Sequence, residues 1–324
     1  MSVRKVLKPI VVIAGLAHLT ACVSVPRTEA GKLADAGIST TTALSTGFRD
    51  LATDFANIDV ISAFSLTYEK CEISPVCEAF TKSPENLEEG QKLEAVINAR
   101  AKAVDGLTNL YRALKTEADY DARQDLLGAV DDAYESVEAY TASVEALTGA
   151  DILSRFFITV IGGVSDKRQR ERILLANEKT KQTLLLYQAA LRAESYYFDA
   201  ILSDNVDTVR ADVKVALFQS GLVNKTEIVL PLIEQMGLVP NSNLEKLNLS
   251  KSTKIAIDAY IQASSEYERA RTKQKFSVAI NALSALVAQH DKLSADQPLK
   301  LEDINRHIQE LDYLVFGDTQ SEGN

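Results

Sequence analysis

The stretch that decides the fold is Leu127–Leu147, which reads LGAVDDAYESVEAYTASVEAL. Its larger apolar residues recur every three or four positions: Leu127, Val130, Tyr134, Val137, Tyr140, Val144 and Leu147. This spacing places them on one face of an α-helix, because a helix completes a turn about every 3.6 residues. Gly149 follows soon afterwards and is a typical residue to end a helix. The stretch therefore predicts an amphipathic helix that packs along one side.

The same periodicity extends on both sides of this stretch. A second apolar stripe precedes it, at Leu93, Ile97, Val104, Leu107, Tyr111 and Leu114. Ser83 and Pro84 form a start signal, so we expect one long helix over 85–147, with a kink or short break at Asp119–Asp121. Similar patterns predict helices over 28–70, 166–219 and 251–290, a short helix opened by Asn224 and interrupted by Pro231, and a last helix after Pro298.

Composition agrees with a helical fold. The 324 residues include no Trp, only 14 Gly and 7 Pro, and 46% are hydrophobic. Residues 156–160 and 228–233 have a β-like composition, but each stretch is isolated. We find no repeat of fixed period, which disfavours a solenoid. The prediction is an all-α, elongated up-and-down bundle of four long helices and two short ones.

The first residues are typical of an export signal. Arg4, Lys5 and Lys8 precede a short apolar stretch, Pro9–Leu19. Its apolar core of about ten residues is half of what a membrane-spanning helix needs. A basic start followed by a short apolar segment is the pattern of a secretory signal peptide.

The sequence Leu19-Thr20-Ala21-Cys22 resembles the lipobox of bacterial lipoproteins. The resemblance covers residues 1–22 only and implies cleavage before Cys22, which then carries a diacylglyceryl group and an acyl chain such as palmitate. Val23, rather than Asp, follows the cysteine. This implies an outer-membrane anchor facing the periplasm, whereas a Gram-positive host would place the same anchor in the plasma membrane. An ordinary signal with a chance cysteine and an uncleaved N-terminal helix are the alternatives.

These observations suggest a domain division. We expect a lipoprotein signal peptide at 1–21, a lipidated tether at 22–30, a helical bundle domain at 31–317 and a disordered tail at 318–324. Cys71 and Cys77 would be the remaining thiols, and in an oxidising compartment such a close pair predicts a disulfide. Zinc binding is the alternative, but the neighbouring residues supply no further ligands.

Charge and motifs argue against several function classes. The net charge of −10 disfavours nucleic-acid binding. The chain lacks the phosphate-binding loop, the zinc-protease motif and the nucleophile elbow of hydrolases. His290 and His307 are candidate general bases without an evident partner, and Asp199, Asp204 and Asp207 lack the spacing of a calcium loop. We therefore expect no enzymatic activity, metal or cofactor.

The segment Ile152–Val164, ILSRFFITVIGGV, is apolar apart from Arg155 and is followed by a basic cluster, Lys167, Arg168, Arg170 and Arg172. Apolar residues beside basic ones suit an anionic membrane, although the segment also fits a plug that folds onto the bundle. The candidate contact residues for a membrane or a partner are Phe156, Phe157, Ile158, Val160, Ile161, Lys167, Arg168 and Arg170.

Three functions follow from these features, in decreasing order of preference. The first is a lipid-anchored scaffold or accessory subunit of a cell-envelope assembly, with an envelope protein as partner. The second is membrane engagement through 152–164, by bridging or pore formation. The third is an enzyme with a site near His307. The sequence also contains recurring tyrosines that could line a ligand groove but are expected in the core: Tyr111, Tyr134, Tyr140, Tyr187, Tyr196 and Tyr197.

Overall fold

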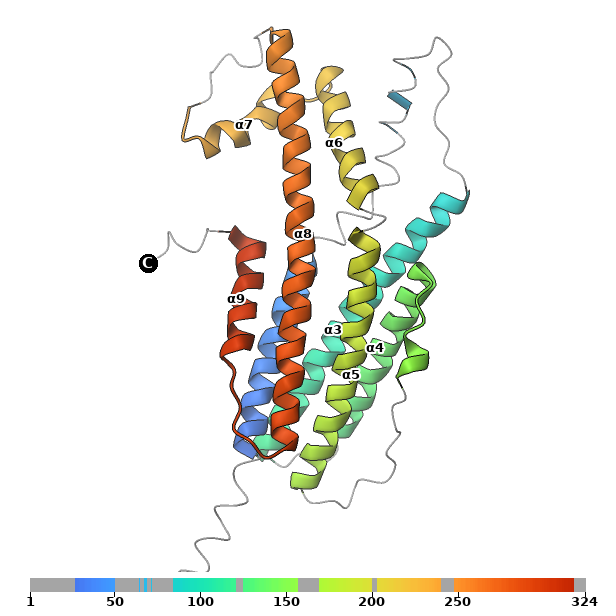
Figure 1. The fold of residues 1–324 in the computed structure, drawn as a ribbon, viewed down its shortest axis with the longest axis vertical. Helices are drawn as coiled ribbons and strands as arrows, with labels where there is room; N and C mark the ends of the chain where they lie inside the picture. Colours follow the sequence, from blue (N-terminus) through green and yellow to red (C-terminus); the bar gives the residue numbers. More distant parts are fainter. Residues whose placement is uncertain are drawn as a thin grey trace, which may run out of the picture. The chain divides into compact units, whose positions relative to one another are not determined.

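The computed structural model of this chain describes residues 27–49, 64, 67–68, 71, 84–120, 125–156, 169–199, 203–239 and 248–317. The regular structure of these residues is helical, and none of them lies in a strand (Figure 1). The all-α prediction is therefore confirmed for the described part of the chain. The β-like stretch 228–233 also lies in a helix.

The long helix predicted over 85–147 is divided in two. It consists of α3 (Pro84–Tyr120) and α4 (Asp125–Thr148), while residues 121–124 lie outside the described residues. α3 begins at the predicted proline and ends within the Asp119–Asp121 sequence that was expected to break the helix. Gly149 follows α4 with φ of 70°, and its N–H donates to the carbonyl of Glu145 at 2.8 Å. The predicted glycine cap is thus confirmed.

The helix predicted over 166–219 is also divided. It consists of α5 (Gln169–Tyr197), extended by two π-helical residues at 198–199, and α6 (Ser203–Gln219). The sequence predicted one continuous helix because the apolar spacing continues through Phe198, Leu202 and Val206. Residues 200–202, between these two helices, lie outside the described residues.

Three further helices complete the described part of the chain: α7 (Lys225–Gln235), α8 (Lys251–Ser294) and α9 (Glu302–Phe316). Asn224 caps α7, as predicted, but its side chain accepts from the N–H of Thr226 at 2.9 Å rather than from that of Glu227. Ser250 accepts from the N–H of Thr253 at 3.1 Å and thereby caps α8. Both caps satisfy N–H groups that have no partner within the helix.

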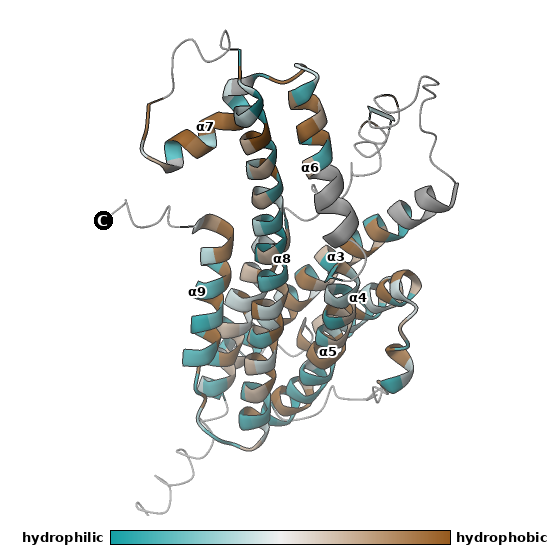
Figure 2. Ribbon diagram, turned by 45° about the horizontal axis from the view of Figure 1, so that its top comes forward, coloured by the Kyte–Doolittle hydropathy of each residue, from teal (hydrophilic) through white to brown (hydrophobic). Residues whose placement is uncertain are grey.

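The chain divides into two compact units. Unit 1 comprises Met1–Gly47, Asn98–Arg192 and Ser277–Asn324, and unit 2 comprises Phe48–Ile97 and Ala193–Phe276. In unit 1, α4 buries Val130, Val137, Tyr140 and Val144 from its predicted stripe. The other three members, Leu127, Tyr134 and Leu147, are half-buried. Figure 2 shows how hydrophobic and hydrophilic residues alternate along these helices.

The expectation that the recurring tyrosines are buried holds only in part: Tyr134 is half-buried, Tyr196 is 77% exposed, and Tyr197 is buried in unit 2. Three other tyrosines form part of the core of unit 1. Tyr111, Tyr140 and Tyr187 are fully buried, and the rings of Tyr140 and Tyr187 lie 5.3 Å apart between centroids. Gly37, in the helix over 27–49, faces the ring of Tyr111 so closely that a Cβ atom at this position would overlap the ring. The glycine therefore allows this helix to approach α3.

Unit 2 has a smaller core at the junction of α6, α7 and α8. Ala211, Phe218, Ile257 and Ile261 are buried there, and Val215, Ile228, Val229 and Leu249 pack against them. A second contact joins three aromatic rings: Phe276 lies 4.9 Å from Phe48 and 5.2 Å from Phe198 between ring centroids.

Candidate functional site

Most of the residues predicted from the sequence for lipidation, for the disulfide and for membrane or partner contact lie outside the described residues: Cys22, Cys77, Phe157, Ile158, Val160, Ile161, Lys167 and Arg168. Cys71 is disulfide-bonded, whereas its proposed pairing with Cys77 stays a prediction. Arg170 is exposed, and its guanidinium lies 3.3 Å from a carboxylate oxygen of Asp296. An exposed pair of this kind contributes little to stability.

The beginning of the apolar segment 152–164 is fixed to the end of α4. A carboxylate oxygen of Glu145 accepts hydrogen bonds from the N–H groups of Ile152 at 2.5 Å and Leu153 at 2.7 Å. A single 3₁₀ turn, η1 (Leu153–Arg155), follows. Phe156 is half-buried, so the one described phenylalanine of the segment is neither in the core nor fully exposed.

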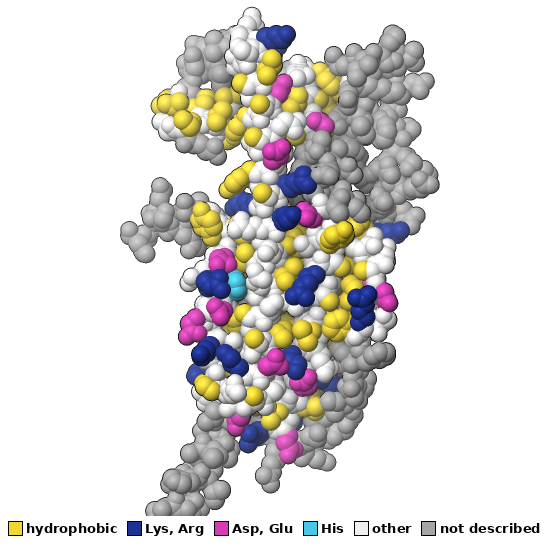
Figure 3. Space-filling view, viewed as in Figure 1, with side chains coloured by type: hydrophobic (Ala, Val, Ile, Leu, Met, Phe, Trp, Pro, Cys, Tyr) yellow, Lys and Arg dark blue, Asp and Glu magenta, His cyan; other side chains and the backbone are white. Residues whose placement is uncertain are grey.

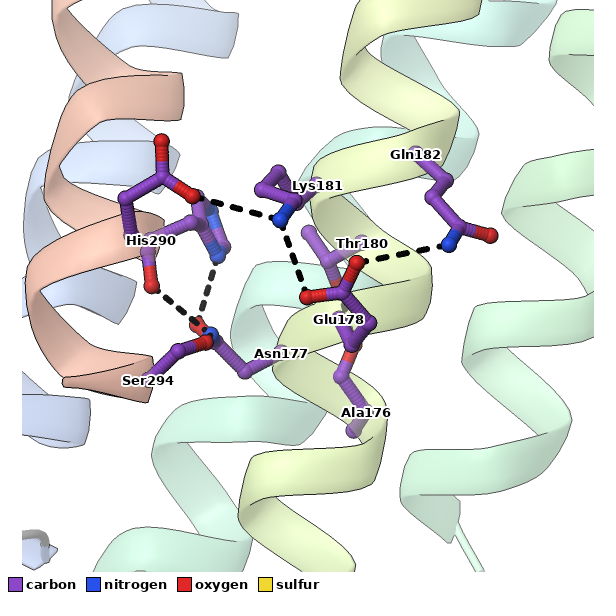
Figure 4. Close-up of polar contacts among 9 residues, drawn as sticks. Ala176, Asn177, Glu178, Thr180, Lys181, Gln182, His290 and Ser294 are labelled. Carbon is purple, nitrogen blue, oxygen red and sulfur yellow. Dashed lines mark hydrogen bonds and ion pairs between the residues drawn. The ribbon is translucent and has the colours of Figure 1, made fainter. Parts of the chain in front are cut away.

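The residue with the most reactive chemistry in the described interior is His290, on α8. It is fully buried between α3 and α5, and both of its ring nitrogens are hydrogen-bonded. Nε2 lies 2.7 Å from the hydroxyl of Tyr111, and Nδ1 lies 2.7 Å from the amide oxygen of Asn177. Figure 4 shows Asn177 and His290 facing each other between two helices of unit 1.

The hydrogen bonds of Asn177 determine which nitrogen of His290 carries the proton. The Asn177 amide nitrogen lies 2.9 Å from the backbone carbonyl of His290 and 2.8 Å from the hydroxyl of Ser294. A carbonyl can only accept, so the amide NH₂ donates to it and the amide oxygen accepts from Nδ1–H. Nε2 is then the acceptor, and Tyr111 donates its hydroxyl proton to it. We call this chain of groups, Tyr111–His290–Asn177–Ser294, the histidine relay.

Burial keeps the histidine relay neutral. It lowers the pKa of His290 to about 3, with the nearby charge of Lys181 acting in the same direction and the hydrogen bond to Asn177 opposing them. Burial also raises the pKa of Tyr111 well above its usual range. The charged form of either group is disfavoured because the interior solvates charge poorly. The relay therefore cross-links α3, α5 and α8 without exposing a base to substrate.

Further polar side chains of α5 connect to the same face of α8. Lys181 lies 3.0 Å from Glu178 and 3.2 Å from Asp291 (Figure 4). About two helical turns after Lys181 on α5, the Gln188 amide donates to the carbonyl of Ile280 at 2.9 Å and to Ser284 at 2.5 Å. Gln188 is buried, so these bonds lie in the interior of unit 1.

A buried ion pair joins α3 and α5. The guanidinium of Arg172 donates to one carboxylate oxygen of Glu117 from Nη2 at 2.7 Å and from Nε at 3.1 Å. Both side chains are almost completely buried, at 3% and 0% exposure. Sequence reasoning missed this pair because Arg172 belongs to the basic cluster, which was attributed to a membrane-facing surface. No local signal in the sequence links it to Glu117, 55 positions earlier.

His307 lies on α9 in a different environment. Its Nδ1 is 3.0 Å from a carboxylate oxygen of Glu310, and Arg306 reaches both Glu310 at 3.1 Å and Asp303 at 3.3 Å. The hydrogen bond from His307 lowers the pKa of the Glu310 carboxyl. These partners are three or four positions apart, as expected for neighbours on one helical surface. Within the described residues, no group of three or more His, Cys, Asp or Glu is arranged to hold a metal ion.

The end of unit 2 exposes apolar side chains that the sequence analysis did not single out. Leu222 is 69% exposed, Met236 67%, Leu238 62% and Val239 91%, and none of Ile228–Ile233 is buried. Together with the first turn of α8, Lys251–Lys254, and the exposed Ile255, we call this region the α7 surface. Figure 3 shows hydrophobic side chains gathered over α7.

The structure offers no membrane-crossing element among the described helices, since none of them is both long and apolar enough to span a bilayer. Comparisons with protein-family models, with curated proteins and with solved structures gave no match to this chain.

Proposed function

We propose that this chain is a lipid-anchored helical protein that faces the periplasm and serves as a non-enzymatic scaffold or accessory subunit of a cell-envelope assembly. In this proposal Cys22 carries the lipid, the anchor lies in the outer membrane, and residues 31–317 form an elongated up-and-down helical bundle. The tether at 22–30 and the tail at 318–324 flank this domain.

The observation that carries the proposal is that the buried histidine and tyrosine of unit 1 are hydrogen-bonded between helices. His290, Tyr111 and Asn177 are buried, and both ring nitrogens of His290 are hydrogen-bonded to the other two side chains. A general base must reach a substrate proton directly or through one water, and a fully buried imidazole with both nitrogens bonded is poorly placed to do so. The relay is better suited to holding helices together, which is what a scaffold requires.

The first test addresses the anchor. Mass spectrometry of the native protein is expected to find an acylated cysteine at the N-terminus and no leader. A Cys22→Ser variant should lose the acyl mass and leave the acylated-lipoprotein fraction. An intact leader with a free thiol at position 22 would overturn the anchor.

The second test addresses the scaffold role. Native membranes are solubilised in a mild detergent, and the tagged chain is purified by affinity and size-exclusion chromatography. A scaffold is expected to elute with an envelope protein in a fixed ratio. A monodisperse, partner-free monomer from native membranes would contradict the role, whatever the state of Cys22.

Membrane engagement through 152–164 is a second candidate, favoured by the half-buried Phe156 beside an exposed Arg155. Phe156→Asp with Phe157→Asp should abolish vesicle binding by this segment if the candidate is correct. Unchanged binding would eliminate it. An enzyme with a site near His307 is the third candidate, and it requires an activity that His307→Ala abolishes.

A further inference from the structure

The middle of α7 is a run of six apolar residues, with charged residues at both ends of the helix. Its residues Ile228–Ile233 read IVLPLI, and successive helical residues point about 100° apart. Ile228 and Val229 pack against the core of unit 2, which accounts for one side of the helix. Glu227 and Glu234 are seven positions apart and share another side. Leu230 lies between these two glutamates, whereas Ile233 points away from both of them.

The chain immediately after α7 continues this apolar character. Gly237 has φ of 65° and turns the chain, with the exposed Met236 before it and the exposed Leu238 and Val239 after it. Single exposed apolar residues are common on protein surfaces, but a contiguous group of large ones marks an interaction site. The group here combines a helix side with the adjoining turn.

Positive charge lies at the start of α8, the helix that shares the core of unit 2 with α7. Lys251 and Lys254 are both exposed in the first turn of α8, which contains no acidic residue. A helix N-terminus carries partial positive charge, so two lysines there are unfavourable unless an anion compensates them. Neither lysine forms an ion pair with another described residue, in contrast to Lys273, which lies 2.7 Å from Asp199 in the same unit.

Exposed apolar side chains and exposed lysines on the same unit suit the boundary of an anionic bilayer, where acyl chains lie next to phosphate groups. We propose that the α7 surface docks on an anionic lipid bilayer, with Ile233, Met236, Leu238 and Val239 entering the acyl boundary and Lys251 and Lys254 contacting lipid phosphates. This inference goes beyond the scaffold role and requires neither the acyl anchor nor the segment 152–164.

The absence of tryptophan from the chain permits a site-specific test. Leu238→Trp places a single tryptophan on the α7 surface of the full chain. Tyr267→Trp provides a matched control, because Tyr267 is 67% exposed and also belongs to unit 2. Each protein is mixed with vesicles whose acyl chains are brominated, which quench a tryptophan only when it enters the bilayer. One set of vesicles contains phosphatidylglycerol and phosphatidylcholine, and the other contains phosphatidylcholine alone.

We expect strong quenching at position 238 on anionic vesicles, weak quenching there on neutral ones, and little at position 267 on either. The double variant Lys251→Gln, Lys254→Gln should raise the lipid concentration needed for half-maximal quenching about 30-fold. The reason is that each lysine near an anionic surface contributes about fivefold in affinity. Circular dichroism should show an unchanged helix content, because both lysines are exposed.

Three results would overturn the proposal. The first is no quenching at position 238, and the second is equal quenching at positions 238 and 267. The third is quenching at position 238 that depends neither on the lipid charge nor on the two lysines. Emission at position 238 that shifts to the blue with rising protein concentration, without lipid, would assign the surface to a second copy of the chain and also overturn it. These readouts are independent of the mass at Cys22, so failure here leaves the anchor and the scaffold role standing.

Discussion

In unit 1, Asn177, Gln188 and His290 are buried, whereas in unit 2 Met236, Leu238 and Val239 are exposed. The two regions therefore depart from the usual sorting of side chains in opposite directions. The three buried polar side chains named for unit 1 are compensated by hydrogen bonds at 2.5–2.9 Å. The exposed apolar groups of unit 2 have no such compensation within the described residues. The difference separates polar groups that stabilise the fold from apolar groups that are available for binding.

The largest expected effect concerns the buried ion pair of unit 1. Glu117→Ala removes the carboxylate that neutralises the buried guanidinium of Arg172 and should lower the free energy of unfolding by about 4 kcal/mol. Asp35→Ala is the matched control, because Asp35 pairs with Lys115 at an exposed position and should cost less than about 1 kcal/mol. Urea denaturation followed by circular dichroism measures both. Similar losses for the two variants would show that burial does not set the strength of the pair.

The next effect concerns the approach of the helix over 27–49 to α3. Gly37→Ala places a methyl group against the ring of Tyr111, which is fully buried and held by His290. Overpacking of this kind should cost about 2 kcal/mol. Gly128→Ala in α4 is the control, because its new Cβ meets no other atom, and it should stabilise the protein by up to about 1 kcal/mol. A neutral Gly37→Ala would mean that the two helices separate easily.

A smaller effect follows from the pKa of His290, which is about 3 in the folded protein and near 6.5 when the chain is unfolded. Between these values the unfolded chain binds a proton that the folded protein does not, so stability is complete above pH 6.5 and falls as the pH decreases. The slope should approach about 1.4 kcal/mol per pH unit. The difference between the wild-type and His290→Gln unfolding curves isolates this contribution. Parallel curves from pH 7 to pH 5 would refute it.

The smallest effect concerns the exposed apolar residues of unit 2. Leu238→Ser and Val239→Ser remove exposed apolar groups and should change the free energy of unfolding by less than about 0.5 kcal/mol. Thermal unfolding monitored by circular dichroism is sufficient to detect a larger change. A loss above about 1 kcal/mol would show that these side chains support the fold and are not free for binding.

The sequence predicted the helices better than it predicted what they bury. The stripe from Leu93 to Leu114, the caps at Asn224, Ser250 and Gly149, and the buried tyrosines follow from local spacing and local hydrogen bonding, so short-range patterns identify them. The histidine relay and the Glu117–Arg172 pair could not be found in this way, because they join groups more than 50 positions apart. The α7 surface was missed for another reason: six consecutive apolar residues have no periodicity that distinguishes a packed side from an exposed one.

The histidine relay also bears on how precisely α8 is positioned along α5. A slip of one helical turn would displace the imidazole by about 5.4 Å and break its bond to Asn177. Apolar contacts alone would tolerate such a slip, since one aliphatic side chain can replace another at the seam, whereas a donor must meet an acceptor. A single imidazole can thus select one register of two long helices from several alternatives of similar packing.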